Sequence, residues 1–205
     1  MAMESGKSQR QNKVGAYGRM GRLLLVVGGG IIVLVGLAVL ITWLALKPEK
    51  PKYYLEDGAV SQFKINHDGL VTAKLLFNIT TRNPNKKVAI YYDKIDALLL
   101  YDDEEIAWAS IPPFFQGHKN TTFLHTPLSG YLVSLQSDTS RDLKLERSSG
   151  KVDLVFRLYA RIRFKVGNWK SGHYTLSVKC GHVVLDVADK GHTGSFQRMK
   201  CHVHV

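Results

Sequence analysis

The sequence lacks the short motifs by which common enzyme families are identified. A phosphate-binding loop needs glycines at fixed spacing between a strand and a helix, but the one glycine run, residues 28–30, lies inside an apolar segment. There is no G-x-S-x-G elbow, no H-E-x-x-H helix and no C-x-x-C pair. We therefore expect a protein that is not an enzyme, has no catalytic residues and uses no cofactor.

Cysteine is scarce as well. The 205 residues include two, Cys180 and Cys201. An even number is compatible with one disulfide in an oxidising compartment, and two small buried thiols are the alternative. Cys180 shares its strand parity with Val178, and Cys201 shares its own with Val203, so both thiols should point to an apolar face and can meet.

Charge is absent from residues 23–46, a run of 24 residues. At about 1.5 Å per residue, a helix of this length crosses a hydrocarbon core of about 30 Å. A cleavable secretory signal would have an apolar region of about 7 to 15 residues and a small-residue cleavage site. The run is longer and ends in LALKP, so we predict an uncleaved signal anchor.

Basic residues flank this run unequally. Five precede it and three follow it, namely Lys7, Arg10, Lys13, Arg19 and Arg22, then Lys47, Lys50 and Lys52. The positive-inside rule favours a cytoplasmic N-terminus and an extracellular C-terminus. We expect a basic cytoplasmic tail (1–22), a transmembrane helix (23–46), a linker (47–58) and an extracellular domain (59–205). The formal charge of +11 is then split across the bilayer, and the outer domain should favour acidic partners other than nucleic acid.

Two N-x-[ST] sequons agree with an outward domain. They begin at Asn78 and Asn120, and such sites are glycosylated only on the lumenal side. Leu75, Phe77 and Ile79 alternate as in a strand, which predicts that Asn78 and Thr80 lie on its outer face.

The remaining sequence alternates with a period of two, which is typical of half-buried strands. The clearest case is Lys151–Lys165, where apolar even positions alternate with odd positions that are charged except for Val155 and Tyr159. Further strands are expected at Val60–Ile65, Ile95–Tyr101, Thr121–Tyr131, Tyr174–Lys179, Val183–Val187 and Met199–Val205. The segment Leu132–Leu145 breaks the alternation, and a short helix could begin there at Ser134 or Asp138. This pattern predicts a mostly β protein, an antiparallel β-sandwich rather than an α/β enzyme fold.

One face of the 151–165 strand is basic. Arg157, Arg161, Arg163 and Lys165 share parity, and residues two apart on a sheet face lie about 7 Å apart. Such a ladder suits a polyanion, and outside the cell this means acidic polysaccharide or phospholipid. A solvated face screened by salt is the alternative.

Three other groups are weaker candidates. His202 and His204 could chelate a metal ion, but an exposed sheet edge is the preferred interpretation, and we expect no metal site. The run Asp102 to Glu105 lacks the interleaved spacing of a calcium loop, which favours a hairpin turn. Asn83-Pro84-Asn85 is expected to be only a strand-ending turn.

Several blocks in order carry a family resemblance. They are RNPNKKVAIYYDKI (82–95), IPPFFQGHKNTT (111–122), ARIRFKVGNWKSGHYTLSVKC (160–180) and KCHVHV (200–205). With the basic tail and the single apolar segment, they resemble plant NDR/HIN-like, or harpin-induced-like, proteins of the second late embryogenesis abundant class. The resemblance implies an immunoglobulin-like or fibronectin-III-like β-sandwich and a plasma-membrane location, sometimes concentrated at plasmodesmata. It also implies a role in the hypersensitive defence response or in abiotic stress, and pairing of Cys180 with Cys201.

Two functions follow as expectations. The first is a non-enzymatic, single-pass plasma-membrane protein that acts in defence or stress signalling through its outer domain. Its expected partners are membrane lipids, acidic cell-wall polysaccharide or membrane defence proteins. The alternative is a membrane-protecting or lipid-binding stress protein that docks its basic ladder on anionic headgroups.

Overall fold

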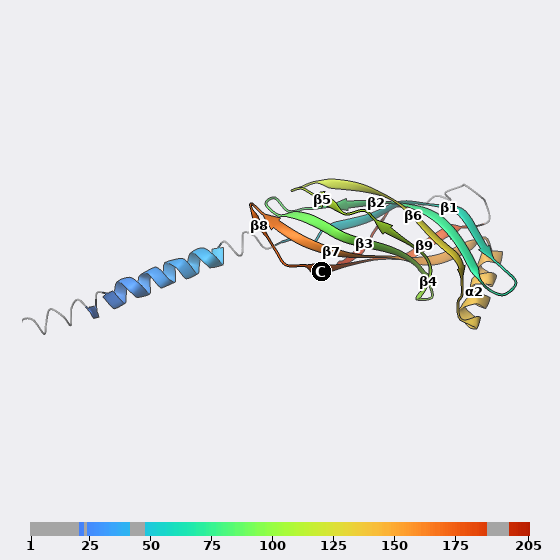
Figure 1. Ribbon diagram of the computed structural model, residues 1–205, viewed down its shortest axis with the longest axis horizontal. Helices are drawn as coiled ribbons and strands as arrows, with labels where there is room; N and C mark the ends of the chain where they lie inside the picture. Colours follow the sequence, from blue (N-terminus) through green and yellow to red (C-terminus); the bar gives the residue numbers. More distant parts are fainter. Residues whose placement is uncertain (1–20, 23, 42–47, 188–196) are drawn as a thin grey trace, which may run out of the picture. The chain divides into compact units, whose positions relative to one another are not determined.

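A computed structural model describes residues 21–22, 24–41, 48–187 and 197–205 (Figure 1). The chain divides into two units, Met1–Lys47 and Pro48–Val205. In the first unit, the helix Leu24–Ile41 has a mean hydropathy of 3.0 over 18 residues, so it is long and apolar enough to cross a membrane. Leu23, residues 42–46 and most of the predicted basic tail lie outside the described residues.

The second unit is mostly β-structure with one short helix. Its elements are β1 (Lys52–Ile65), β2 (Val71–Arg82), β3 (Ala89–Tyr101), β4 (Glu104–Ile111), β5 (Phe114–Gln116), β6 (Thr121–Val133), α2 (Ser137–Ser148), β7 (Lys151–Val166), β8 (Trp169–Lys170), β9 (Tyr174–Asp186), β10 (Met199–Lys200) and β11 (His202–His204). The predicted short helix is confirmed as α2, with Gln136 at its N-cap position and Asp138 in its first turn.

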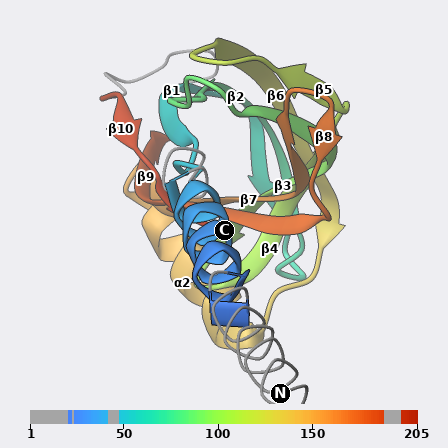
Figure 2. The ribbon, with the colours of Figure 1, turned by 90° about the vertical axis from the view of Figure 1, so that its left-hand side faces the viewer.

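The strands form one antiparallel sheet in the order β10-β1-β2-β6-β4-β3-β7-β9-β11. Figure 2 looks along this unit and shows the strands arranged around a common axis. On one side the two halves of the sheet meet through a single β4–β6 residue pair, Trp108 with Ser129. The approach is so close that a Cβ at Gly130 would overlap the carbonyl oxygen of Ile106.

On the other side, the C-terminal segment joins both edges of the sheet. β10 pairs with β1, β11 pairs with β9, and Cys201 N–H between them donates to the Tyr53 carbonyl at 2.9 Å. The sheet is therefore nearly closed. The predicted sandwich of immunoglobulin or fibronectin-III kind is not confirmed, because alternation shows which face a residue occupies but not which strands pair.

Side chains from the inner face of the sheet fill the core. The alternation expected in Lys151–Lys165 is confirmed, since Val152, Leu154 and Ile162 are fully buried. Phe77 and Phe156 pack with ring centroids 5.5 Å apart. Burying such side chains stabilises the fold by about 1.5–3 kcal/mol each.

The disulfide expected between Cys180 and Cys201 is present, with a Cα–Cα distance of 4.5 Å. Both cysteines are buried, as their shared parity with valines predicted. The bond links β9 to the residue between β10 and β11, so it crosses the point where the sheet closes.

Two predicted boundaries are wrong. β1 begins at Lys52, inside the segment 47–58 assigned to the linker, because Tyr53 and Leu55 already alternate as buried strand residues. β9 is one strand where two were expected, since the break at Gly181 is a bulge: the register with β7 shifts between Leu154 and Phe156, and His182 has φ 58°.

Candidate polyanion-binding face

Strand β7 places the four predicted cations on its outer side. Arg157, Arg161, Arg163 and Lys165 all lie at exposed or half-buried positions that alternate with buried ones. Tyr159 interrupts the series. We call the outer side of β3, β7 and β9 the β7 face.

Two of the four cations are neutralised by carboxylates. Arg157 Nη2 lies 2.6 Å from Asp103 Oδ1. Arg163 donates two hydrogen bonds to Asp93, from Nε to Oδ2 at 2.7 Å and from Nη2 to Oδ1 at 2.5 Å. These hydrogen bonds hold the pKa of the Asp93 carboxyl below its usual value and raise the pKa of Arg163. The simple basic ladder expected from the sequence is thus only half present.

Asp93 reaches β7 because β3 is irregular at this position. The β3–β7 register shifts between Tyr92 and Lys94, so Asp93 is an extra residue in the strand. His173 Nε2 also lies 3.5 Å from Asp93 Oδ2. The bulge therefore brings Asp93 to the β7 face, where Asp96, which lies 2.9 Å from Lys94 Nζ, is a second acid.

The other two cations have no ion pair with any carboxylate in the described part of the chain. Arg161 lies between Lys94 of β3 and Thr175 of β9. Lys165 lies opposite Lys170 of β8, and its Nζ is 5.8 Å from the centre of the Phe115 ring. Lys170 Nζ is 4.8 Å from the centre of the Tyr91 ring. Lys170 was missed as a site residue, although the hairpin signal VGNW would have placed it beside Lys165.

Shallow grooves run across the β7 face beside Arg161. One of about 500 Å³ is lined by Lys94, Asp96, Tyr159, Arg161, His173 and Tyr174 among others. A second of about 550 Å³ shares Lys94, Asp96 and Tyr159 with it and extends to Trp108. Trp108 is 51% exposed and Tyr174 48%. Guanidinium and ammonium groups bind carboxylates, while exposed aromatic rings supply apolar contact area. The face can therefore hold an extended acidic molecule.

Known proteins resemble this chain over most of its length. The profile of the family described as "Late embryogenesis abundant protein" matches residues 78–180, from β2 to β9. The chain belongs to the late embryogenesis abundant family. NDR1/HIN1-like protein 10 of Arabidopsis thaliana is 33% identical over 165 residues, which are 80% of this chain and 73% of that protein. NDR1/HIN1-like protein 1 of the same plant is 34% identical over 153 residues, 73% of each chain. NDR1/HIN1-like protein 3 is 34% identical over 175 residues, 84% of this chain and 76% of that protein.

Within the region matched by the late embryogenesis abundant profile, Asn83 and Asn85 do more than end a strand. Asn83 is fully buried, and its Nδ2 donates to the carbonyls of Val88 at 2.8 Å and Gly117 at 2.9 Å. Its Oδ1 accepts from the backbone N–H of Asn85 at 3.1 Å. The amide of Asn85 bonds both backbone groups of Glu49 at 2.8 Å. The expectation of a strand-ending turn is therefore incomplete, because the motif also fixes where the chain enters this domain.

The two sequons of this family member differ in accessibility. Asn78 is half-buried, and its Oδ1 lies 2.7 Å from His125 Nδ1. Thr80 lies on the same side of β2 as Asn78, the side expected to face outward, but it is only 4% exposed because Tyr54 and Phe123 of the neighbouring strands flank it. Asn120 is exposed in the turn before β6. Glycosylation at either site stays a prediction.

The other two weaker candidates, the histidine pair and the acidic run, lie at the surface. His202 and His204 are exposed, with ring centroids 6.3 Å apart. The described residues contain no group of three potential ligands from His, Cys, Asp and Glu. Asp102 and Asp103, with φ of 46° and 60°, form the two-residue turn of the β3–β4 hairpin.

Proposed function

We propose that this late embryogenesis abundant protein acts in plant defence or stress as a membrane-anchored binding protein, without catalysis. Its β domain binds acidic cell-wall polysaccharide on the β7 face. The observation that carries the proposal is Arg161, which has no ion pair with a described carboxylate and lines a groove together with exposed aromatic rings. Uronic acid chains offer the matching carboxylates at a regular spacing.

The proposal includes a location. The apolar helix Leu24–Ile41 anchors the protein in the plasma membrane, where the protein is enriched at plasmodesmata, with a cytoplasmic N-terminus and an extracellular β domain. The disulfide supports an oxidising compartment, and the similarity to NDR1/HIN1-like proteins supports a role in defence. A shift in electrophoretic mobility after deglycosylation and digestion of the β domain by external protease on intact protoplasts are expected. Protection from protease with no mobility shift would reverse the topology and refute the location.

The binding test uses the full chain in detergent. We expect polygalacturonate to retard it in affinity electrophoresis, fully methyl-esterified pectin to have little effect, and salt to weaken retardation. Arg161→Glu with Lys165→Glu should abolish most of the retardation. Lys64→Glu with Lys74→Glu is the matched control, because it changes the net charge equally at exposed positions of β1 and β2.

The two variants separate the outcomes. Equal loss in both would show that only net charge matters, and no retardation of the unmodified chain would remove the polysaccharide proposal. Binding of the β7 face to anionic vesicles but not to polygalacturonate would favour the lipid-binding stress protein.

A further inference from the structure

The end of the β domain at which the chain enters gathers loops that are rich in lysine. We call it the Pro48 end and define it as residues 48–52, 83–88, 117–120 and 166–171. Glu49 is its single acidic residue, whereas six residues are basic, namely Lys50, Lys52, Lys86, Lys87, Lys119 and Lys170. All six lysines are exposed, and none pairs with a carboxylate of the described residues.

Hydrogen bonds hold these loops in one patch. The amide of Asn85 clamps Glu49, and the Asn85 carbonyl accepts from Lys119 N–H at 3.0 Å. Ala89 pairs with Lys165, so the β7–β8 hairpin continues beside the 83–88 loop. The lysines therefore project from a fixed framework, which means that they can meet a flat charged surface together.

An exposed tryptophan lies in the same patch. Trp169 is 64% exposed and pairs with Val166 across the hairpin tip, where Gly167 has φ +55°. Lys170 follows it directly. Tryptophan is enriched at the headgroup level of membranes, and clustered lysines are attracted to anionic headgroups.

The connection between the apolar helix and the β domain is short, which favours a membrane as the partner of the Pro48 end. Six residues, 42–47, separate Ile41 from Pro48. A fully extended segment of six residues spans only about 20–25 Å. If the helix is in a bilayer, Pro48 cannot move far from that bilayer, and a tethered surface is met at high effective concentration.

We propose that the Pro48 end docks on the anionic headgroups of the membrane that holds the apolar helix. The lysines contact headgroup phosphates and carboxylates, and Trp169 inserts among the headgroups. The inference rests on the membrane anchor in the proposed function, but it concerns the adjoining end of the domain, which shares only Lys170 with the candidate polyanion site, and a different ligand. Docking at this end leaves the grooves beside Arg161 open to a polysaccharide.

The test uses the full chain in vesicles. Trp43→Phe and Trp108→Phe leave Trp169 as the sole tryptophan, since the sequence has three. Vesicles of phosphatidylcholine with or without about 30 mol % phosphatidylserine, which supplies the anionic surface, carry a fraction of lipid with a nitroxide on its headgroup as a short-range quencher of tryptophan fluorescence. We expect at least about twofold stronger quenching of Trp169 in the anionic vesicles, lost at about 0.5 M salt. Lys86→Glu with Lys87→Glu should remove the difference, and Lys64→Glu with Lys74→Glu should keep it.

Carbonate extraction of the same vesicles separates the two proposals. A chain that resists extraction but shows no quenching, or equal quenching in neutral and anionic vesicles, overturns the docking and leaves the anchor intact. Release of the chain by carbonate would refute the membrane anchor and, with it, the docking of the Pro48 end. Relief of the quenching by polygalacturonate would assign the Pro48 end to polysaccharide and also overturn the proposal.

Discussion

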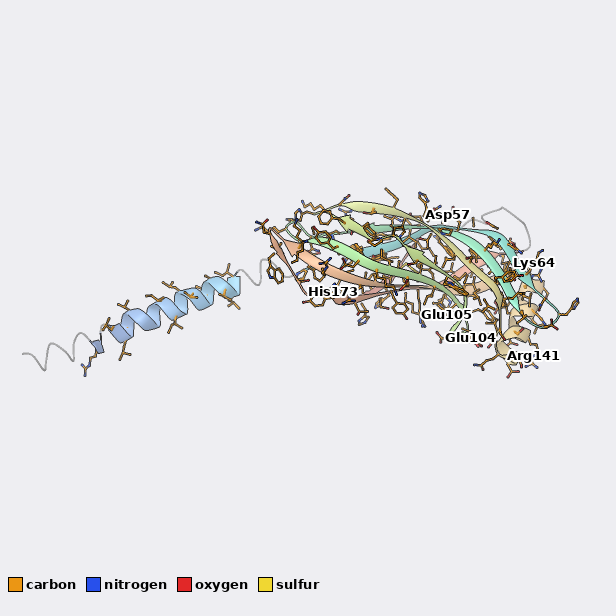
Figure 3. The ribbon with its side chains drawn as sticks, viewed as in Figure 1. Asp57, Lys64, Glu104, Glu105, Arg141 and His173 are labelled. Atoms are coloured by element: carbon orange, nitrogen blue, oxygen red, sulfur yellow. A yellow bond between two sulfur atoms is a disulfide. The ribbon has the colours of Figure 1, made fainter. Side chains whose placement is uncertain are left out.

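The two ends of the β domain carry opposite charge. The Pro48 end has six basic residues and one acidic residue. At the other end, residues 66–69, 102–105 and 137–148 include Arg141, Lys144 and Arg147 against Asp68, Asp102, Asp103, Glu104, Glu105, Asp138, Asp142 and Glu146. Figure 3 labels Glu104, Glu105 and Arg141 near this α2 end and His173 toward the opposite end. The net charge of +11 is therefore not spread evenly: the β domain is basic at the Pro48 end and acidic at the α2 end.

Different interactions stabilise each of the two ends. The α2 end depends on packing, since Leu143 of α2 is fully buried and Ser140 Oγ donates to the Gly69 carbonyl at 3.1 Å. The Pro48 end depends on buried amides, chiefly that of Asn83. Substitutions at the two ends should therefore lower the free energy of unfolding for different reasons.

The largest effect is expected from Leu143→Ala, which tests the packing at the α2 end. Truncating a fully buried leucine should lower the free energy of unfolding by about 2–5 kcal/mol, because it leaves a cavity under the helix. Urea unfolding followed by tryptophan fluorescence measures it. Leu145→Ala is the control, since Leu145 is 64% exposed and its loss should cost less than about 0.5 kcal/mol.

Asn83→Asp tests the amide at the Pro48 end. Aspartate keeps the shape but cannot donate to Val88 and Gly117, so a loss of about 1–3 kcal/mol in the free energy of unfolding is expected. Asn66→Asp at the α2 end should be nearly neutral, because Asn66 Oδ1 only accepts, from Leu70 N–H at 2.8 Å. Equal losses in the two variants would contradict the distinction between the ends.

Reversing charge at either end should change binding more than stability. Lys86→Glu with Lys87→Glu should elute from a sulfonate column at lower salt, and Glu105→Lys with Asp142→Lys at higher salt. All four residues are exposed, so the free energy of unfolding should change by no more than about 0.5 kcal/mol per site. Identical elution of the two variants would contradict any contribution of these charges to binding on the column.

The smallest effect concerns Asp93, the acid that pairs with Arg163 on the β7 face. Its pKa in the folded protein lies below the ordinary value of 3.8, because Arg163 donates hydrogen bonds to it. The stabilisation is therefore present above about pH 4 and is lost as the pH falls through the folded pKa. Asp93→Asn should lower the melting temperature slightly at pH 6 and leave it nearly unchanged at pH 2–3. An equal difference at both pH values would assign the loss to packing.

The sequence predicts those features that depend on local pattern. The apolar run predicted a helix, the alternation in Lys151–Lys165 predicted the buried face of β7, and shared parity with valines predicted two thiols on one face. Each of these depends on the spacing of residues within one element.

Features that depend on distant residues could not be predicted in this way. Arg163 and Asp93 are 70 positions apart, and Asp93 reaches its partner only through a bulge. β4 was not predicted, because its first residues, Glu104 and Glu105, were interpreted as part of an acidic turn. The near closure of the sheet could not be predicted for the same reason, since the period of a strand does not reveal its partners.

The closing segment of the sheet sets a limit on how the domain can be made. β10 and β11 come last in the described chain, but they bridge β1, the first strand, to β9. The sheet therefore cannot be completed during synthesis before Cys201 and its neighbours have emerged. Until then the edges of β1 and β9 stay open to other strands, and such edges promote aggregation. We expect a ribosome-bound chain that lacks these residues to depend on chaperones, and the Cys180–Cys201 bond to form only after Cys201 has emerged.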